Sequence, residues 1–224
     1  MPDSRAEFFR KVFEENVWKD AESRSGAGSN LAATVRVRSD LPAALRYYGI
    51  RSILDAPCGD FAWMQMVDLG QTTYIGGDIV PQIVDANNVL YSRDNRRFSV
   101  IDLVEDDLPD VDLIFCRDCL IHFSNDLILR TLRNMARSSA RFVMLTHDVS
   151  LRRYAGVGWK NIDLDRATDE GVNFEFRPLN LTLPPFNLPP PIFVITEGQW
   201  DNGKVMAMWT TDQLRSVLDG DAAA

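Results

Sequence analysis

Three aspartates lie at or near the ends of successive apolar segments, in an order that could hold one nucleoside. Asp55 ends SILD, Asp78 ends TTYIGGD and Asp102 lies within FSVIDLV. In an open parallel sheet, ligands bind beyond the carboxyl ends of the strands, where carboxylates accept hydrogen bonds. We expect Asp55 to face a cationic group, Asp78 to accept from both ribose hydroxyls and Asp102 to accept from the amino group of adenine. These carboxylates together predict a site for an adenosine with a positively charged tail, and S-adenosylmethionine has those groups.

The turn after Asp55 reads APCGDF and contains one glycine, Gly59. An NAD or FAD site would place Gly-x-Gly-x-x-Gly here, because the backbone must approach the pyrophosphate closely. The sequence therefore argues against a dinucleotide, and we expect Cys58, Gly59 and Asp60 to lie beside the tail of the nucleoside. Ser29, in the loop SRSGAGSN, is a further candidate contact for the methionine carboxylate. The alternative for this loop is a plain linker between helices.

Both histidines of the chain fall where chemistry would occur. His122 follows the fourth predicted strand and His147 ends the fifth. Transfer of a methyl group to a hydroxyl needs proximity, orientation and a base. Either histidine is a candidate base, with His147 slightly favoured because it ends a strand directly. The alternatives are a packed helix residue for His122 and a strand cap for His147.

Two further carboxylates, Asp118 and Asp148, end the neighbouring fourth and fifth predicted strands. Oxygen ligands of this kind suit Mg²⁺, which would lower the pKa of a substrate hydroxyl. The sequence therefore raises a magnesium site at Asp118 and Asp148 as a hypothesis. Asp118 could instead take part in catalysis by hydrogen-bonding the substrate or His147.

These residues are positioned by alternating strand and helix patterns from Arg51 onward, which predict a parallel sheet covered on both faces. The expected strands are SILDA, TTYIGGDIV, FSVIDLV, VDLIFCRD and ARFVMLTHD, followed by PIFVITE and GKVMAMWTT. The expected helices are 5–18, 31–48, 61–69, 81–92, 125–138 and a short one from Asp212. We expect one domain, with a helical cap (1–50), a cofactor-binding core (51–148), a substrate lid (149–191) and C-terminal strands (192–224).

Six prolines fall between positions 178 and 191, which disfavours regular structure in the second half of the lid segment. A lid over the substrate and a loop that covers the sheet edge are equally compatible with this composition. If the segment is a lid, its aromatic side chains would line the substrate pocket and its polar side chains would bind hydroxyls of the substrate. The candidates are Trp159, Phe174, Phe176 and Phe186, and Asn161, Asp163, Arg177 and Asn180.

The segments SILDAPCGDFAWM, YIGGDIV, SVIDLV and DLIFCRDCLIHF resemble motifs one to four of the class I S-adenosylmethionine-dependent methyltransferases. The resemblance covers residues 50–148 and departs at the Pro57–Cys58 position of motif one. It implies a Rossmann-like, doubly wound α/β sheet of seven strands with the last one antiparallel. It also implies a cofactor site, for which the candidates are Ser29, Asp55, Cys58, Gly59, Asp60, Asp78, Ile79, Asp102, Leu103 and Arg117. The narrowest resemblance is to mycobacterial-type sugar 1-O-methyltransferases of methylmannose polysaccharide synthesis.

The composition limits the possible partners. The chain has 224 residues, a net charge of −8 and scattered arginines, which argues against a nucleic-acid substrate. No apolar run is long enough to span a membrane, and three cysteines without a secretory signal suit a reducing cytoplasm. We expect O-methylation of a small substrate, with a saccharide first, by a homodimer. The alternative is N- or carboxyl-methylation of a small metabolite.

Overall fold

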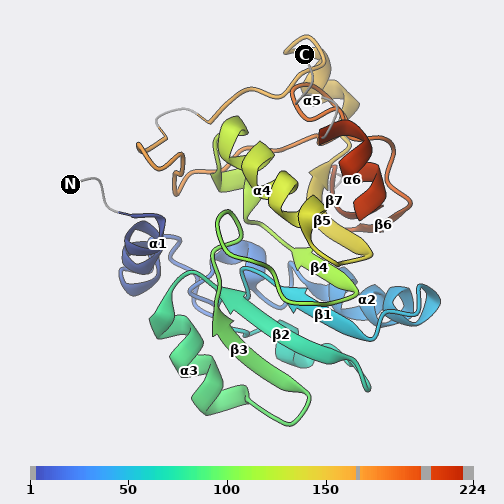
Figure 1. Ribbon diagram of the computed structural model, residues 1–224. Coiled ribbons are helices and arrows are strands. Elements are labelled where there is room, and N and C mark those ends of the chain that lie inside the picture. The colour runs from blue at the N-terminus through green and yellow to red at the C-terminus, as the bar shows by residue number, and fades with distance from the viewer. Residues whose placement is uncertain (1–3, 165–166, 198–202, 219–224) are drawn as a thin grey trace.

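The computed structural model of this protein describes residues 4–164, 167–197 and 203–218, and these residues form a sheet of seven strands. The strands are β1 (Ser52–Asp55), β2 (Thr73–Asp78), β3 (Arg96–Val100), β4 (Leu113–Cys116), β5 (Phe142–Asp148), β6 (Phe193–Thr196) and β7 (Lys204–Thr210). They are arranged in the order β3-β2-β1-β4-β5-β7-β6 (Figure 1).

Strands β1 to β5 pair in parallel, whereas β7 is antiparallel to both β5 and β6. This confirms the predicted doubly wound sheet with an antiparallel last strand. The strand order reverses between β1 and β4, so the carboxyl ends of these two strands flank the point where such sheets bind ligands.

Helices cover both faces of the sheet, which is why most strand residues are buried (Figure 1). On β1, Leu54 packs in the cluster that contains α4 and α6, whereas its neighbour Ile53 packs in the cluster that contains α2. This alternation follows from the period of two along a strand. The helices are α1 (Arg5–Glu14), α2 (Val35–Tyr47), α3 (Pro81–Tyr91), α4 (Asn125–Arg137), α5 (Leu151–Ala155) and α6 (Thr211–Leu218).

The predicted helix over 61–69 is wrong, because this stretch forms only a single 3₁₀ turn, Met64–Met66. Phe61 has a φ of 59°, which lies in the left-handed region, and a helix cannot continue through that conformation. The Asp60 side chain also accepts a hydrogen bond from the Ala62 N–H (3.2 Å) and so favours a turn over a helix.

Asp102 does not lie inside a strand, because β3 ends at Val100. The Asp102 N–H donates to the carboxylate of Asp106 (2.8 Å), and Asp102 Oδ1 accepts from the Val104 N–H (2.9 Å). These side-chain bonds replace the strand ladder with a turn just beyond the sheet. The sequence pattern also missed the short helix α5.

The predicted lid divides into two parts with different roles. Phe186 is fully buried in the core, and the amide of Asn161 donates to the carbonyls of Asn180 and Pro184 (both 2.9 Å). The proline-rich half is therefore a fixed cover of the sheet, whereas residues 176–179 reach the cavity described below. No helix within the described ranges is both long and apolar enough to cross a membrane.

Candidate functional site

A cavity of about 690 Å³ lies at the carboxyl ends of β1, β2, β4 and β5. The strand ends form its floor, and residues from α1, the loop after it and the segment 176–179 form its roof. Every residue predicted for cofactor binding, catalysis or metal binding lines this cavity: Ser29, Asp55, Cys58, Gly59, Asp60, Asp78, Ile79, Asp102, Leu103, Arg117, Asp118, His122, His147 and Asp148.

Asp55 is almost completely buried at the end of β1. Its Oδ2 accepts a hydrogen bond from the Tyr74 hydroxyl (2.5 Å) on the adjacent strand. Burial raises the pKa of Asp55 to about 7, although the Tyr74 hydrogen bond and the charge of Arg117 act in the opposite direction. A cation in the cavity would stabilise the ionised form, as expected for a carboxylate that faces a charged ligand.

Asp78 ends β2 and holds the turn after β1 in place. Its two oxygens accept from the Gly59 N–H (3.1 Å) and the Val80 N–H (3.0 Å), and burial raises its pKa to about 6. Gly59 has a φ of 53°, and a Cβ there would lie 2.3 Å from Ser25 Oγ. Glycine is therefore required both by the backbone conformation and by the close approach of the N-terminal loop.

The N-terminal loop is attached to this turn by Asp60. Its carboxylate accepts from the Ser23 hydroxyl (2.9 and 3.0 Å) and from the Arg24 N–H (2.9 Å). Asp60 thus binds the roof to the floor, a task the sequence prediction did not assign to it. Further along the loop, Ser29 lines the cavity, and a Cβ at Gly28 would lie 2.8 Å from the carboxylate of Asp118.

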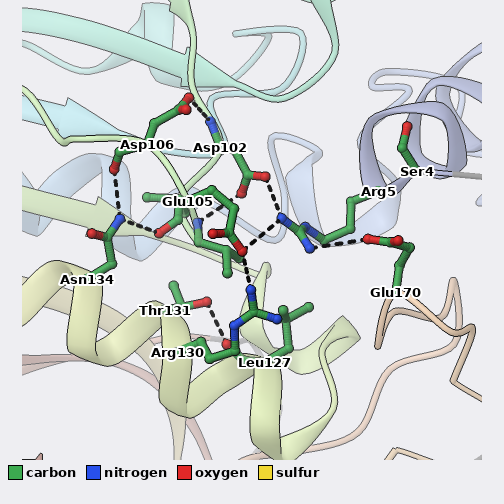
Figure 2. Close-up of polar contacts among 12 residues, drawn as sticks. Ser4, Arg5, Asp102, Glu105, Asp106, Leu127, Arg130, Thr131, Asn134 and Glu170 are labelled. Carbon is green, nitrogen blue, oxygen red and sulfur yellow. Dashed lines mark hydrogen bonds and ion pairs between the residues drawn. The ribbon is translucent and has the colours of Figure 1, made fainter.

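The other end of the cavity contains an ion-pair cluster around Asp102 (Figure 2). Arg5, the first residue of α1, donates from Nη2 to Asp102 Oδ2 (2.6 Å) and from Nη1 to Glu170 (3.3 Å). The guanidinium therefore joins the N-terminal helix, the loop after β3 and the segment that follows residue 167. The carboxylate predicted for the adenine amino group already has a charged partner.

Arg117 and Asp118 belong to a buried charge network at the end of β4. The guanidinium of Arg117 makes a bidentate contact with Glu197 (2.6 and 3.0 Å), and Lys204 reaches both Glu197 (3.0 Å) and Asp118 (2.6 Å). Burial alone would lower the pKa of Arg117, but Asp118 and Glu197 outweigh it and raise this pKa. The network crosses from β4 to the β6–β7 pair and fixes the acceptor end of the cavity.

The hypothesis of a magnesium site disagrees with the environment of both carboxylates. Asp118 is paired with Lys204 and lies 3.3 Å from Arg117, and Asp148 is paired with Arg153. Burial would raise the pKa of Asp118, but the two cations outweigh it and lower this pKa to about 2. Among the described residues, no group of three or more His, Cys, Asp or Glu side chains could hold a metal ion. The charges beside these carboxylates take the place that a cation would need.

His147 has the wrong tautomer for the base predicted from the sequence. Its Nδ1 accepts a hydrogen bond from the Leu181 N–H (3.1 Å), so in the neutral ring the proton is on Nε2. Burial lowers the pKa of His147 to about 4, which keeps the ring neutral near pH 7. His147 can therefore donate a hydrogen bond to a ligand but has no free lone pair to accept a proton.

His122 has the opposite tautomer. Its Nδ1 lies 3.0 Å from the Glu175 carbonyl, which can only accept, so Nδ1 carries the proton and Nε2 has the lone pair. Burial lowers the pKa of His122 below its usual range, although the Glu175 hydrogen bond and Asp118 act in the opposite direction. The Trp18 ring packs against it with a centroid distance of 5.2 Å, and Trp18 Nε1 donates to the Phe174 carbonyl (3.0 Å).

Few of the aromatic and polar side chains predicted for the lid reach the cavity. Phe176 and Arg177 line it, whereas Trp159 and Phe174 are exposed elsewhere and Phe186 is in the core. Arg177 donates to the carbonyls of residues in the turn after β4 and so anchors the segment. The predicted hydroxyl-binding roles are wrong for Asn161 and Asn180, which bond to each other, and for Asp163, which accepts from a backbone N–H.

Solved structures with this arrangement share little sequence with the chain. The Burkholderia thailandensis 1,6-didemethyltoxoflavin-N1-methyltransferase, with bound 1,6-didemethyltoxoflavin and S-adenosylhomocysteine, matches with a TM-score of 0.58 and 15% identity over 92% of this chain and 86% of that chain. The magnesium protoporphyrin IX methyltransferase ChlM from Synechocystis PCC 6803 matches with a TM-score of 0.55 and 13% identity over 92% and 95%. The fold is that of the Rossmann-like methyltransferases.

Other comparisons add less. Human N-acetylserotonin methyltransferase in complex with SAM matches with a TM-score of 0.48 and 16% identity over 66% of this chain, and the chain spans only 42% of that protein. No protein-family model matches the sequence, and neither does any curated protein.

Three residues that shape the cavity within this fold were missed by the sequence analysis: Arg5, Glu197 and Lys204. Each comes from outside the alternating segment, and all but Glu197 line the cavity directly. A charge at the end of an otherwise apolar strand pattern, as in VITE and GKVMAMW, was the available signal for Glu197 and Lys204.

Proposed function

We propose that the protein is an S-adenosylmethionine-dependent O-methyltransferase that acts on a hydroxyl of a small molecule. The observation that carries the proposal is the row of Asp55, Asp78 and Asp102 along one cavity of a methyltransferase-type sheet. When bound, the cofactor supplies an electrophilic methyl group on a sulfonium. The neighbours with this fold have different acceptors in their names, so the fold alone supports no acceptor.

The cavity residues fit this cofactor. Asp55 offers a buried carboxylate to the cationic methionine end, and its raised pKa falls back when a cation is near. Asp78 has two oxygens, each with one backbone partner and with lone pairs left for ribose hydroxyls. The Gly59 turn leaves room for the N-terminal loop to close over the same end.

His122 is the residue we assign as the base. Its Nε2 lone pair can take the hydroxyl proton, because the Glu175 carbonyl fixes the proton on Nδ1. The lowered pKa keeps this ring neutral and ready to accept near pH 7. His147, a fixed donor in the same cavity, would hold an acceptor oxygen in place. Asp118, with its pKa of about 2, stays ionised and positions rather than accepts protons.

A saccharide is the acceptor class we expect first. Trp18 and Phe176 both contact the His122 ring, with centroid distances of 5.2 and 6.4 Å, and aromatic side chains of this kind pack on sugar rings. Paired donor and acceptor histidines suit a substrate with several hydroxyls.

A labelled-methyl screen over sugars, catechols and carboxylic acids tests the proposal directly. We expect label to enter an alkali-stable ether of a hydroxylated acceptor, with release of S-adenosylhomocysteine. Transfer only to a carboxylate or an amine would refute methylation of a hydroxyl and establish the alternative class. Calorimetry with S-adenosylmethionine tests the cofactor separately, and Asp78→Ala should weaken that binding.

A further inference from the structure

Arg5 is placed as part of the cofactor site although it belongs to the N-terminal helix. Its side chain is 11% exposed and lines the cavity together with Asp102. Nη2 donates to Asp102 and Nη1 to Glu170, as Figure 2 shows. Both terminal nitrogens of the guanidinium therefore have carboxylate partners.

The third nitrogen of the guanidinium, Nε, is buried and has no hydrogen-bond partner among the described residues. A buried donor without a partner is costly, and more so when it carries charge. The two carboxylates already hold the guanidinium in one orientation, so Nε–H is a fixed donor beside Asp102. An acceptor atom on a bound ligand would remove this cost.

A second donor belongs to the residue that follows Asp102 in the chain. The N–H of Leu103 takes part in none of the hydrogen bonds found among the described residues, whereas the N–H groups of Asp102 and Val104 both donate to carboxylates. Leu103 also lines the cavity. The residues around Asp102 thus offer two donors, Arg5 Nε–H and the Leu103 N–H, and one acceptor, the Asp102 carboxylate.

Adenine presents the complementary order along one side of its ring system. N1 accepts, the 6-amino group donates and N7 accepts. With the amino group on Asp102 and N1 toward the Leu103 N–H, N7 is the acceptor left for Arg5. No other common base offers an acceptor on both sides of an exocyclic amine in this way.

We propose that Arg5 Nε–H donates a hydrogen bond to N7 of the adenine, so that the first turn of α1 recognises the base. This inference rests on the proposed S-adenosylmethionine function and adds a residue to it. The guanidinium of Arg5 also donates to Glu170, so the group that recognises the base also holds the segment after residue 167 in place.

Isothermal calorimetry with S-adenosylhomocysteine and its 7-deaza analogue tests the contact. The analogue replaces N7 with C–H and keeps N1 and the amino group. Arg5→Lys is the informative variant, because lysine keeps a cation for Asp102 but offers no second fixed donor. Arg10→Lys is the matched control, since Arg10 lies on the same helix and pairs with Glu7 and Glu14 near the surface.

We expect the wild-type protein and Arg10→Lys to bind the 7-deaza analogue about tenfold more weakly than S-adenosylhomocysteine, in keeping with one hydrogen bond from a charged donor. Arg5→Lys should bind both ligands alike, at the weaker affinity, with an unchanged melting temperature as the check on folding. Equal affinities of the wild type for the two ligands, or discrimination retained in Arg5→Lys, would overturn the role of Arg5 alone. Absence of any S-adenosylhomocysteine binding by the wild type would overturn the proposed function as well.

Discussion

The buried network around Glu197 makes a strong prediction about stability. The Glu197 side chain is 2% exposed and that of Arg117 is 4% exposed, and they share a bidentate contact. Glu197→Gln removes one negative charge from a site that keeps both Arg117 and Lys204. The NH₂ group of the new glutamine would face the N–H donors of Arg117 or Lys204 in at least one orientation of the amide. Breaking a buried pair from one side costs about 3–5 kcal/mol of the free energy of unfolding.

Urea denaturation measures this loss. With an m-value of about 2–3 kcal/mol/M, the midpoint of Glu197→Gln should fall by about 1–2.5 M. Asp212→Asn is the control, because it breaks an ion pair with Arg215 in which the Asp212 side chain is 87% exposed. That change should cost less than about 1 kcal/mol. If Glu197→Gln is no more destabilising than the control, the network does not hold β6 and β7 on β4.

Three further predictions concern the cavity. Affinity for S-adenosylmethionine should rise between about pH 5.5 and 7.5, because Asp55, with a pKa of about 7, must lose its proton to bind the cationic tail, and Asp78, with a pKa of about 6, must lose its proton to accept from both ribose hydroxyls. Asp55→Asn should flatten the upper part of a calorimetric pH series. In steady-state assays, His122→Gln should reduce kcat at least 100-fold and leave the Kd for the cofactor unchanged. His147→Gln should mainly raise the KM for the acceptor. If His147→Gln lowers kcat and His122→Gln raises KM instead, the two histidines have exchanged roles. EDTA should leave the methyl-transfer rate unchanged, because Asp118 already has cationic partners. If EDTA abolishes the activity and added Mg²⁺ restores it, this reasoning is wrong.

The sequence predicts the floor of the cavity well because strand ends are local features. Asp55 and Asp78 follow apolar runs that can only be buried strands, and parallel pairing brings their ends together without further information. The residues predicted at these strand ends consequently line one cavity. The error over 61–69 arose because a periodic apolar pattern cannot reveal a left-handed residue such as Phe61.

The roles of the two histidines could not be predicted, because irregular segments decide them. The carbonyl of Glu175 and the N–H of Leu181 fix the proton on opposite nitrogens of His122 and His147. Leu181 lies in the proline-rich stretch and Glu175 lies just before it, in irregular segments whose path no periodicity describes. The contact of Arg5 with Asp102 joins residues far apart in the chain, and only the fold places them together.

The position of β7 between β5 and β6 has a consequence for how the chain is made. Of the described strands, β7 is synthesised last, yet it is the only described partner of β5 on the side away from β4. Until it is synthesised, FVMLTHD remains an apolar open edge of the nascent sheet, and such edges are templates for aggregation. Chains interrupted before Lys204 should therefore accumulate as insoluble protein, while those that reach Thr210 can seal the sheet.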